Sequence, residues 1–131
     1  MHLEPLPFSK LMGIDIVSVT PDLVIGELKV REDLCTRPAV LHGGAYMAFA
    51  DEVGGLTAGL NLMPGMRTTT VESKTNFFRA CPPGRLTAES VPLHVGRCTI
   101  VVQTSIYTPE GKRAAIVTQT QLVMPRERTP H

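Results

Sequence analysis

The feature that most constrains the fold is one long segment with helical periodicity, about residues 41–62 of a 131-residue chain. Apolar side chains and one threonine recur there at helical spacing and form a stripe that consists of Tyr46, Phe49, Ala50, Val53, Leu56, Thr57 and Leu60. A stripe of this width has to be buried against another element. Met63-Pro64-Gly65 follows and ends the helix. The rest of the chain therefore has to supply a broad surface that covers the helix.

Two strands are expected before the helix and four after it, because these segments are rich in β-branched residues and alternate with turn residues. The expected strands are 14–19, 23–30, 68–78, 85–95, 97–107 and 112–123. Pro92 lies inside the fourth of them and predicts a bulge or an edge there. A short helix or turn is expected at 5–12, and an irregular loop at 31–40.

This order predicts an α+β fold in which a curved, mostly antiparallel sheet wraps around one long central helix. Strands and helices do not alternate, so a doubly wound parallel sheet is excluded. We expect a single domain over residues 1–131, with a frayed, charged tail at 125–131. One curved sheet of this size leaves strand edges open, and self-association is the usual way to cover them.

Composition and charge exclude several classes of protein. Hydrophobic residues make up 43% and charged residues 19%, as in ordinary globular domains. The net charge of +1 and the lack of tryptophan argue against nucleic-acid binding. No apolar run approaches the roughly 18 residues that cross a bilayer, and the N-terminus has no secretory signal, so no membrane partner is expected. A small enzyme, a small-molecule binding module and an interaction domain remain.

The three cysteines are Cys35, Cys81 and Cys98. Their odd number and wide spacing fit neither a disulfide framework nor a zinc site, so no metal is expected. Free cysteines are typical of a reducing compartment, and we expect the protein to be cytoplasmic.

The face of the helix opposite the stripe combines small residues with one acid: Gly44, Met47, Ala48, Asp51, Gly54, Gly55 and Ala58. Glycine destabilises a helix interior, so close approach of a backbone or ligand, or tight packing on the sheet, has to explain this face. Asp51 is either a solvated helix residue or, if buried, a functional one. His42-Gly43-Gly44 stands at the helix start, where free N–H groups can stabilise a developing oxyanion. His42 is otherwise a helix cap or a packed imidazole.

Leu41-His42-Gly43-Gly44, with an acid nine positions after the histidine, resembles the hotdog-fold acyl-CoA thioesterases of the 4HBT superfamily, most closely their phenylacetate-degradation (PaaI-like) branch. Residues 70–80, Thr-Val-Glu-Ser-Lys-Thr-Asn-Phe-Phe-Arg-Ala, resemble the strand of that branch written T-V-E-x-x-x-N-F-x-R-P. Residues 84–88, 93–97 and 107–112 resemble its later stretches. The resemblance covers about residues 7–124.

The resemblance implies an enzyme that hydrolyses an acyl-CoA thioester to a carboxylic acid and free CoA. Asp51 would be the nucleophile or general base, the Gly43 N–H would polarise the thioester carbonyl, His42 would shape that corner, and Thr70 would position water. The coenzyme A arm would lie against Asn76, Phe77, Phe78, Arg79, Ala80, His94, Val95, Gly96, Arg97, Cys98 and Thr99. Arg79 and Arg97 would stand near its phosphates.

The resemblance further implies that the site forms across a homodimer, with two dimers pairing into a homotetramer. No cofactor is implied, because coenzyme A is part of the substrate. At two positions the chain departs from the family pattern: Thr36 replaces an Asn or Gln that donates to the carbonyl, and Gly55 replaces a Ser or Thr. The threonine hydroxyl is a shorter donor.

Two alternatives remain open at this point. One is a hotdog module that binds and senses an acyl-CoA without turnover, against which Asp51 and His42-Gly43 argue. The other is a dehydratase or hydratase, which needs a second His/acid pair, and His94 falls in the implied CoA stretch instead. For the acyl group, Phe8, Met12, Phe49 and Met63 are expected near Asp51 and would suit an aryl or medium-length chain.

Overall fold

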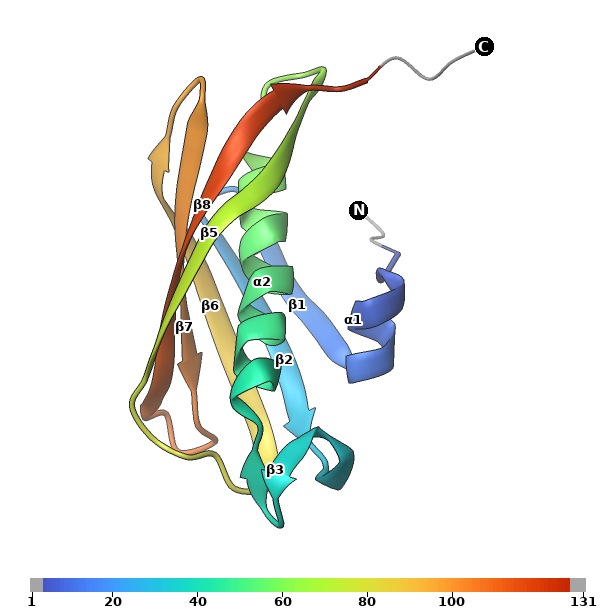
Figure 1. Cartoon of the computed structure of the whole chain (residues 1–131), viewed down its shortest axis with the longest axis vertical. Helices are drawn as coiled ribbons and strands as arrows, with labels where there is room; N and C mark the ends of the chain where they lie inside the picture. Colours follow the sequence, from blue (N-terminus) through green and yellow to red (C-terminus); the bar gives the residue numbers. More distant parts are fainter. Residues whose placement is uncertain (1–3, 128–131) are drawn as a thin grey trace.

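The computed structural model describes residues 4–127 (Figure 1). Its elements are α1 (Pro7–Met12), β1 (Ile14–Thr20), β2 (Leu23–Val30), a 3-10 helix η1 (Glu32–Leu34), β3 (Cys35–Arg37), β4 (Val40–Leu41), α2 (Gly43–Leu60), β5 (Met66–Phe77), β6 (Gly84–Val95), β7 (Thr99–Tyr107) and β8 (Arg113–Pro125). Six strands form one antiparallel sheet in the order β1-β2-β6-β7-β8-β5. This sheet curves around α2, and the β3–β4 hairpin lies beside the start of α2 (Figure 1). The predicted hotdog fold is confirmed.

The core lies between α2 and the sheet. Phe49 and Val53 of α2 are fully buried, together with Leu28, Leu86 and Ile106 of the strands. Full burial of a side chain of this size stabilises the fold by about 1.5–3 kcal/mol. The predicted stripe thus does face the sheet.

A glycine on β2 allows the helix to approach this closely. A Cβ added to Gly26 would stand 2.9 Å from a methyl group of Val53 and 3.4 Å from the Phe49 ring. Because real Cβ atoms do not come so near, any side chain at position 26 would push α2 away from the sheet. The helix position is therefore set partly by the strand sequence.

Several boundaries differ from the sequence-based expectation. The helix begins at Gly43 and ends at Leu60, because His42 is its N-cap and Asn61 its C-cap. The region expected as an irregular loop contains η1, β3 and β4. The expected bulge at Pro92 is confirmed by a register shift between Pro92 and His94.

The tail is more ordered than expected as far as the structure describes it. Pro125 belongs to β8, and the Arg126 N–H donates to the Gly65 carbonyl at 2.9 Å. These bonds continue the pairing of β8 with the start of β5. Residues 128–131 of the predicted tail lie outside the described residues.

The small-residue face of α2 divides into two parts. Gly54 and Ala58 are buried against the sheet, so the expectation that they lie opposite the apolar stripe was wrong. Asp51, Gly44 and Met47 are exposed. The reason is geometric: at 3.6 residues per turn, positions 54 and 58 fall beside 50 and 57, which face the sheet.

β5 is an edge strand with an open side. Among the described residues it pairs with β8 on one side only, and its exposed side chains include Val71 (58% exposed) and Phe77 (51% exposed). Unpaired N–H and C=O groups along a strand of this length can pair with another chain. Within residues 4–127, no helix is long and apolar enough to cross a membrane.

Candidate active site

The start of α2 carries a free backbone donor. His42 adopts an extended backbone conformation, and its Nδ1 accepts a hydrogen bond from the Gly44 N–H at 2.8 Å. His42 is therefore the helix cap, one of the two alternatives left open by the sequence. The first N–H groups of a helix have no partner within it. The Gly44 N–H is thus occupied, whereas the Gly43 N–H has no hydrogen-bond acceptor within residues 4–127 and can meet a ligand at the positive end of the helix dipole.

Aromatic side chains stand next to this donor. A Cβ on Gly43 would lie 3.5 Å from the ring of Phe77, which packs edge-on against Tyr46 with 5.5 Å between ring centroids. The Tyr46 hydroxyl donates to the Arg79 carbonyl at 3.2 Å. Burial, followed by the neighbouring Cys81 thiol, raises the pKa of Tyr46 above its ordinary value, so its hydroxyl stays protonated and donates. The end of β5 is thus tied to the start of α2.

Asp51 lies two turns further along α2. The side chain is exposed, but its Oδ1 accepts a hydrogen bond from Nε2 of Gln119 at 2.7 Å. Gln119 is fully buried on β8. This surface carboxylate is therefore anchored to the core through Oδ1, and Oδ2 can react with a substrate or a water molecule.

The neighbouring acid, Glu52, is not fully exposed to solvent. It is half-buried on the side of α2 that faces α1. Burial raises the pKa of Glu52, more than its hydrogen bond with Ser9 lowers it, and the charge of Asp51 adds to the increase. Asp51 and Glu52 thus stand in different environments although they are adjacent.

Thr70 on β5 is held in the same way as Asp51. Its hydroxyl accepts a hydrogen bond from Nε2 of Gln121 at 2.8 Å, and Gln121 is 2% exposed. Gln119 and Gln121 are two residues apart on β8 and face the same side of the sheet. Asp51 and Thr70 therefore attach to neighbouring positions of one strand.

Gln119 and Gln121 were missed from the sequence, although a signal was present. The core-facing positions of β8 alternate with outward ones, and among Ala115, Val117, Gln119 and Gln121 only the last two are polar. Burial of an amide is unfavourable unless the amide forms hydrogen bonds. Two glutamines at core-facing positions therefore indicate hydrogen-bond partners nearby.

A single chain does not bring Gly43 and Asp51 together. They are eight residues apart on one helix, which places them about 12 Å apart along its axis. A thioester carbonyl cannot touch the Gly43 N–H and the Asp51 carboxylate of the same chain. Thr36 lies exposed on β3, in the hairpin that precedes α2.

The residues expected to hold coenzyme A fall into two groups at opposite ends of the sheet (Figure 1). Residues 76–80 are at the end of β5, and residues 94–99 form the turn from β6 to β7. Thr99 of β7 pairs with Leu122 of β8, and Leu122 pairs in turn with Thr69 of β5. Thr69 lies eight residues before Phe77 on the same strand. Eight residues of strand span about 26 Å. Arg79 and Arg97 of one chain are therefore not neighbours.

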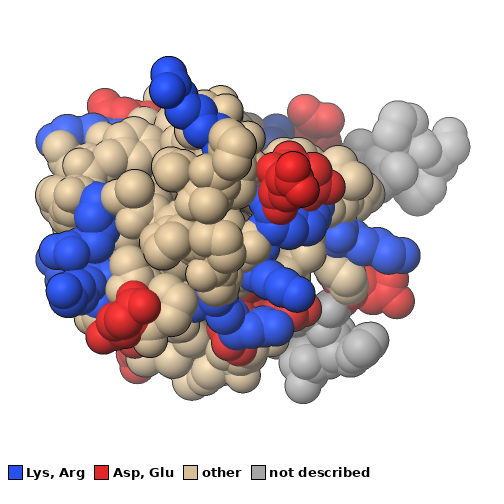
Figure 2. Space-filling model, turned by 90° about the horizontal axis from the view of Figure 1, so that it is seen from below, with Lys and Arg blue, Asp and Glu red and all other residues tan. Residues whose placement is uncertain are grey.

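Arg79 and Arg113 lie together at one end of the sheet. Arg79 Nε donates to the Arg113 carbonyl at 3.3 Å, and the Arg113 guanidinium lies 5.9 Å from the centre of the Tyr107 ring. Figure 2 views the molecule from this end and shows several groups of Lys and Arg side chains with Asp and Glu side chains interspersed among them.

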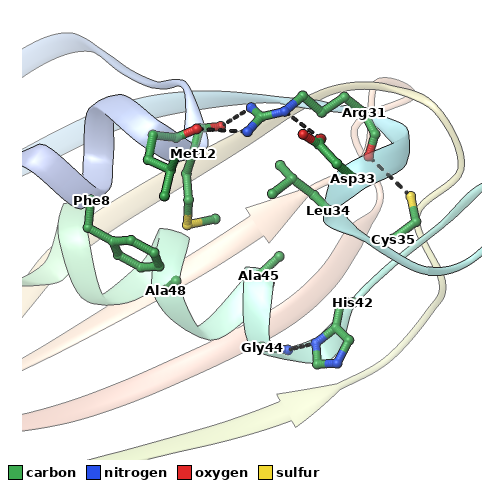
Figure 3. Close-up of a pocket in the computed structure, with 11 residues that line it drawn as sticks. Phe8, Met12, Arg31, Asp33, Leu34, Cys35, His42, Gly44, Ala45 and Ala48 are labelled. Atoms are coloured by element: carbon green, nitrogen blue, oxygen red, sulfur yellow. Dashed lines mark hydrogen bonds and ion pairs between the residues drawn. The ribbon is translucent and has the colours of Figure 1, made fainter.

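A cavity of about 390 Å3 opens between α1, η1 and the first turns of α2 (Figure 3). Its lining consists of Phe8, Leu11, Met12, Arg31, Asp33, Leu34, Cys35, His42, Gly44, Ala45 and Ala48. Phe8 and Met12 were expected near the site, and both line this cavity. The other two residues expected near Asp51 do not line it: Phe49 is buried in the core, and Met63 is 74% exposed beyond the far end of α2.

Arg31 holds the wall of this cavity in place. Its guanidinium donates to the carbonyls of Leu11 at 2.7 Å and Met12 at 2.6 Å, and pairs with Asp33 at 2.6 Å (Figure 3). These bonds satisfy carbonyl groups at the end of α1 that the short helix leaves open. The position of α1, and with it of Phe8, depends on Arg31.

Comparisons with known proteins identify the family. The model of the Thioesterase superfamily (4HBT) matches residues 39–115, more than half of the chain. The chain belongs to the thioesterase superfamily. It is accordingly a hydrolase that acts on thioesters. The matched region of this thioesterase contains both the start of α2 and Asp51.

Individual relatives agree with this assignment. A Saccharolobus solfataricus protein with an esterase name is 31% identical over 106 residues, covering 81% of this chain and 75% of its own. The 1,4-dihydroxy-2-naphthoyl-CoA hydrolase of Listeria monocytogenes is 25% identical over 117 residues, covering 89% and 94%. The crystal structure of a Haemophilus influenzae thioesterase superposes with a TM-score of 0.88 at 27% identity, covering 95% and 87%.

Within residues 4–127, no three His, Cys, Asp or Glu side chains are grouped so as to hold a metal ion. Cys81 is fully buried, and burial raises the pKa of its thiol, so it does not act as a thiolate nucleophile. His94 stands at the end of β6, in the group of residues that is remote from Phe77. Asp51 is therefore the candidate for the attacking group.

Proposed function

We propose that this thioesterase hydrolyses acyl-CoA thioesters, with Asp51 of one chain and the Gly43 N–H of a second chain acting on the same carbonyl. The observation that carries the proposal is a pair of groups on α2, one at the start of the helix and one near its middle. One is an anchored carboxylate with a free oxygen, and the other is a helix start with a free N–H. About 12 Å separates them within a chain, so a complete site requires two chains.

In the proposed reaction, the carbonyl oxygen accepts a hydrogen bond from the Gly43 N–H, which stabilises the negative charge that develops there. Asp51 either attacks the carbonyl carbon, forming a mixed anhydride that water cleaves, or removes a proton from the attacking water. Both routes consume one water, break the C–S bond and release a carboxylic acid and the thiol of CoA. Thr70, held by Gln121, positions the water in this scheme. No cofactor is part of it.

The second chain is supplied by the open edge of β5. Two copies of β5 paired antiparallel around a twofold axis would form one continuous sheet and lay the two α2 helices side by side. The exposed faces of α2 and β5 carry Met47 and Val71, which such pairing would cover. The twofold places the start of one helix beside the middle of the other, so that each dimer has two sites.

We further propose that two such dimers pair. Leu93 and Val95, at the β6–β7 end of the sheet, are about half exposed and offer a second apolar surface. The resulting homotetramer is the assembly implied by the resemblance to the PaaI-like branch, to which we assign the chain.

The acyl group that we propose is an aryl or medium-length chain in the cavity beside α2. Most of the lining is apolar, and Ala45 and Ala48 leave space along the helix (Figure 3). The cavity lies next to His42, and so next to the start of α2 where the carbonyl would bind. The Listeria relative, whose name specifies an aryl acyl group on CoA, supports this choice.

For coenzyme A, we propose that two chains share the binding site. Residues 76–80 of one chain, which include Arg79, bind one part of the arm, and residues 94–99 of another chain, which include Arg97, bind the other part. This division follows from the distance of about 26 Å between the two groups within a chain. Arginine is suited to the phosphates because its planar fork binds two oxygens at once.

A panel of acyl-CoA thioesters tests the proposal, with release of free CoA thiol as the signal. We expect the highest kcat/KM for aryl and medium-length acyl groups and low values for acetyl-CoA, which fills little of the cavity. Saturable binding of acyl-CoA without any thiol release would contradict hydrolysis and favour the sensing alternative.

A further inference from the structure

Gln119 is a fully buried, uncharged amide that is hydrogen-bonded to Asp51, the candidate attacking group. An apolar side chain could fill the same space. Its amide crosses from β8 to α2, where Nε2 donates to Asp51 Oδ1 at 2.7 Å. Its own carbonyl oxygen, Oε1, is buried and has no hydrogen-bond partner within the described residues. The orientation of the amide is fixed by chemistry, because a carboxylate only accepts and must therefore face the NH2 group.

The helix is built to admit this amide. A Cβ added to Gly54 would collide with Oε1 of Gln119 and would stand 3.2 Å from a methyl group of Val102. Gly54 lies less than one turn after Asp51 on α2, so the missing side chain opens a slot beside the carboxylate. This explains a glycine that helix propensity alone disfavours.

An unpartnered buried carbonyl destabilises a fold, and an apolar side chain of the same size would avoid that loss. Met at position 119 would fill the same volume on β8 without an orphaned polar atom. A buried amide at this position therefore indicates a role other than stability. The contact with Asp51 identifies that role.

We propose that Gln119 is the positioning residue of the active site: it fixes one oxygen of Asp51 and directs the other toward the thioester. This proposal rests on the proposed function, in which Asp51 is the attacking or water-activating group. Asp51 is otherwise an exposed side chain free to change rotamer. Holding a reacting group in its productive geometry contributes to kcat, and misplacement by about 1 Å can cost about 100-fold.

The test is Gln119→Met, measured for kcat, KM and Tm. We expect kcat to fall about 10- to 100-fold, KM to stay within about twofold, and Tm to stay equal or rise. The matched control is Thr104→Val on β7, which removes another fully buried polar group without a partner and does not touch Asp51. The control should leave both kinetic constants unchanged. An unchanged kcat in Gln119→Met, or a lower Tm together with parallel changes in kcat and KM, would overturn the proposal.

Gly54→Ala tests the same contact from the helix side. The added methyl group displaces the Gln119 amide, so kcat should fall with Asp51 and Gln119 both still present. If kcat is unaffected, the amide does not occupy the slot and the proposal fails.

A readout that needs no turnover separates this proposal from the proposed function. The side-chain NH2 resonances of Gln119 should exchange slowly with solvent in the wild-type protein and shift in Asp51→Asn. Identical resonances in the two proteins would overturn the positioning role. If the resonances shift in Asp51→Asn as expected but the wild-type protein hydrolyses no thioester, the proposed function alone is contradicted.

Discussion

The shared active site can be tested by mixing two inactive variants. Asp51→Asn removes the attacking charge, and Gly43→Pro removes the N–H that stabilises the oxyanion. Proline is well tolerated at the first position of a helix, where Gly43 stands. The preceding residue, His42, already has φ −64° and ψ 138°, which a following proline favours. The second variant should therefore lose its donor and keep its helix.

The expected recovery follows from the geometry. Each variant alone forms dimers in which both sites lack one group. In a mixed dimer, one site carries both defects and the other carries neither, if Asp51 and Gly43 come from different chains. Random association makes about half of the dimers mixed, so the mixture should regain about a quarter of the wild-type activity. The parent variants should be reduced by about 100-fold or more.

The assay is thiol release from the best acyl-CoA of the panel, after the two variants are unfolded together and refolded. Each variant refolded alone and the refolded wild type are the controls. Activity that stays at the mean of the two parents would refute the reasoning, because it would mean that Asp51 and Gly43 serve a carbonyl within one chain. A distance of about 12 Å along α2 makes that outcome incompatible with the fold described above.

Three further outcomes are expected. Thr36→Ala should lower kcat by no more than about tenfold, because the Gly43 N–H rather than the short hydroxyl carries the polarisation; a loss of several hundredfold in the steady-state assay would reverse this ranking. Arg79→Ala should raise KM more than it lowers kcat, and the wild-type KM should rise with salt, because the nucleotide end of CoA is anionic; a loss confined to kcat would place Arg79 elsewhere. The raised pKa of Glu52 means that its carboxyl stabilises the fold below its ordinary pKa of 4.5 and loses that contribution as the pH rises through the folded-state value. Glu52→Gln should therefore raise Tm near about pH 7 and have little effect near about pH 4. Thermal unfolding at the two pH values measures this, and the same Tm difference between variant and wild type at both would contradict the account.

The sequence was sufficient for the fold because its strongest patterns are local. Helical spacing over 41–62 and alternation in the later strands predicted α2, the order of elements and the hairpin at the N-terminus, all of which are confirmed. The β3–β4 hairpin was missed because its strands are only three and two residues long, too short for periodicity to appear.

Contacts between distant residues were harder to predict. Gln119 and Asp51 are 68 positions apart, and only the pairing of strands brings them together. Gly54 was placed on the open face because a narrow apolar stripe does not define how far the buried side of a helix extends. The separation of Arg79 from Arg97 likewise depends on strand register, which fixes the ends of β5 and β6.

The central claim is that Asp51 carries out thioester hydrolysis, and Asp51→Asn tests it most directly. The asparagine oxygen can still accept the hydrogen bond from Gln119, so the fold and the binding of acyl-CoA should survive. We predict a fall in kcat of at least ~10³-fold with Tm unchanged, while Glu52→Gln, which alters the adjacent acid, keeps wild-type kcat. An Asp51→Asn variant that folds and retains a tenth of the wild-type kcat would contradict the account.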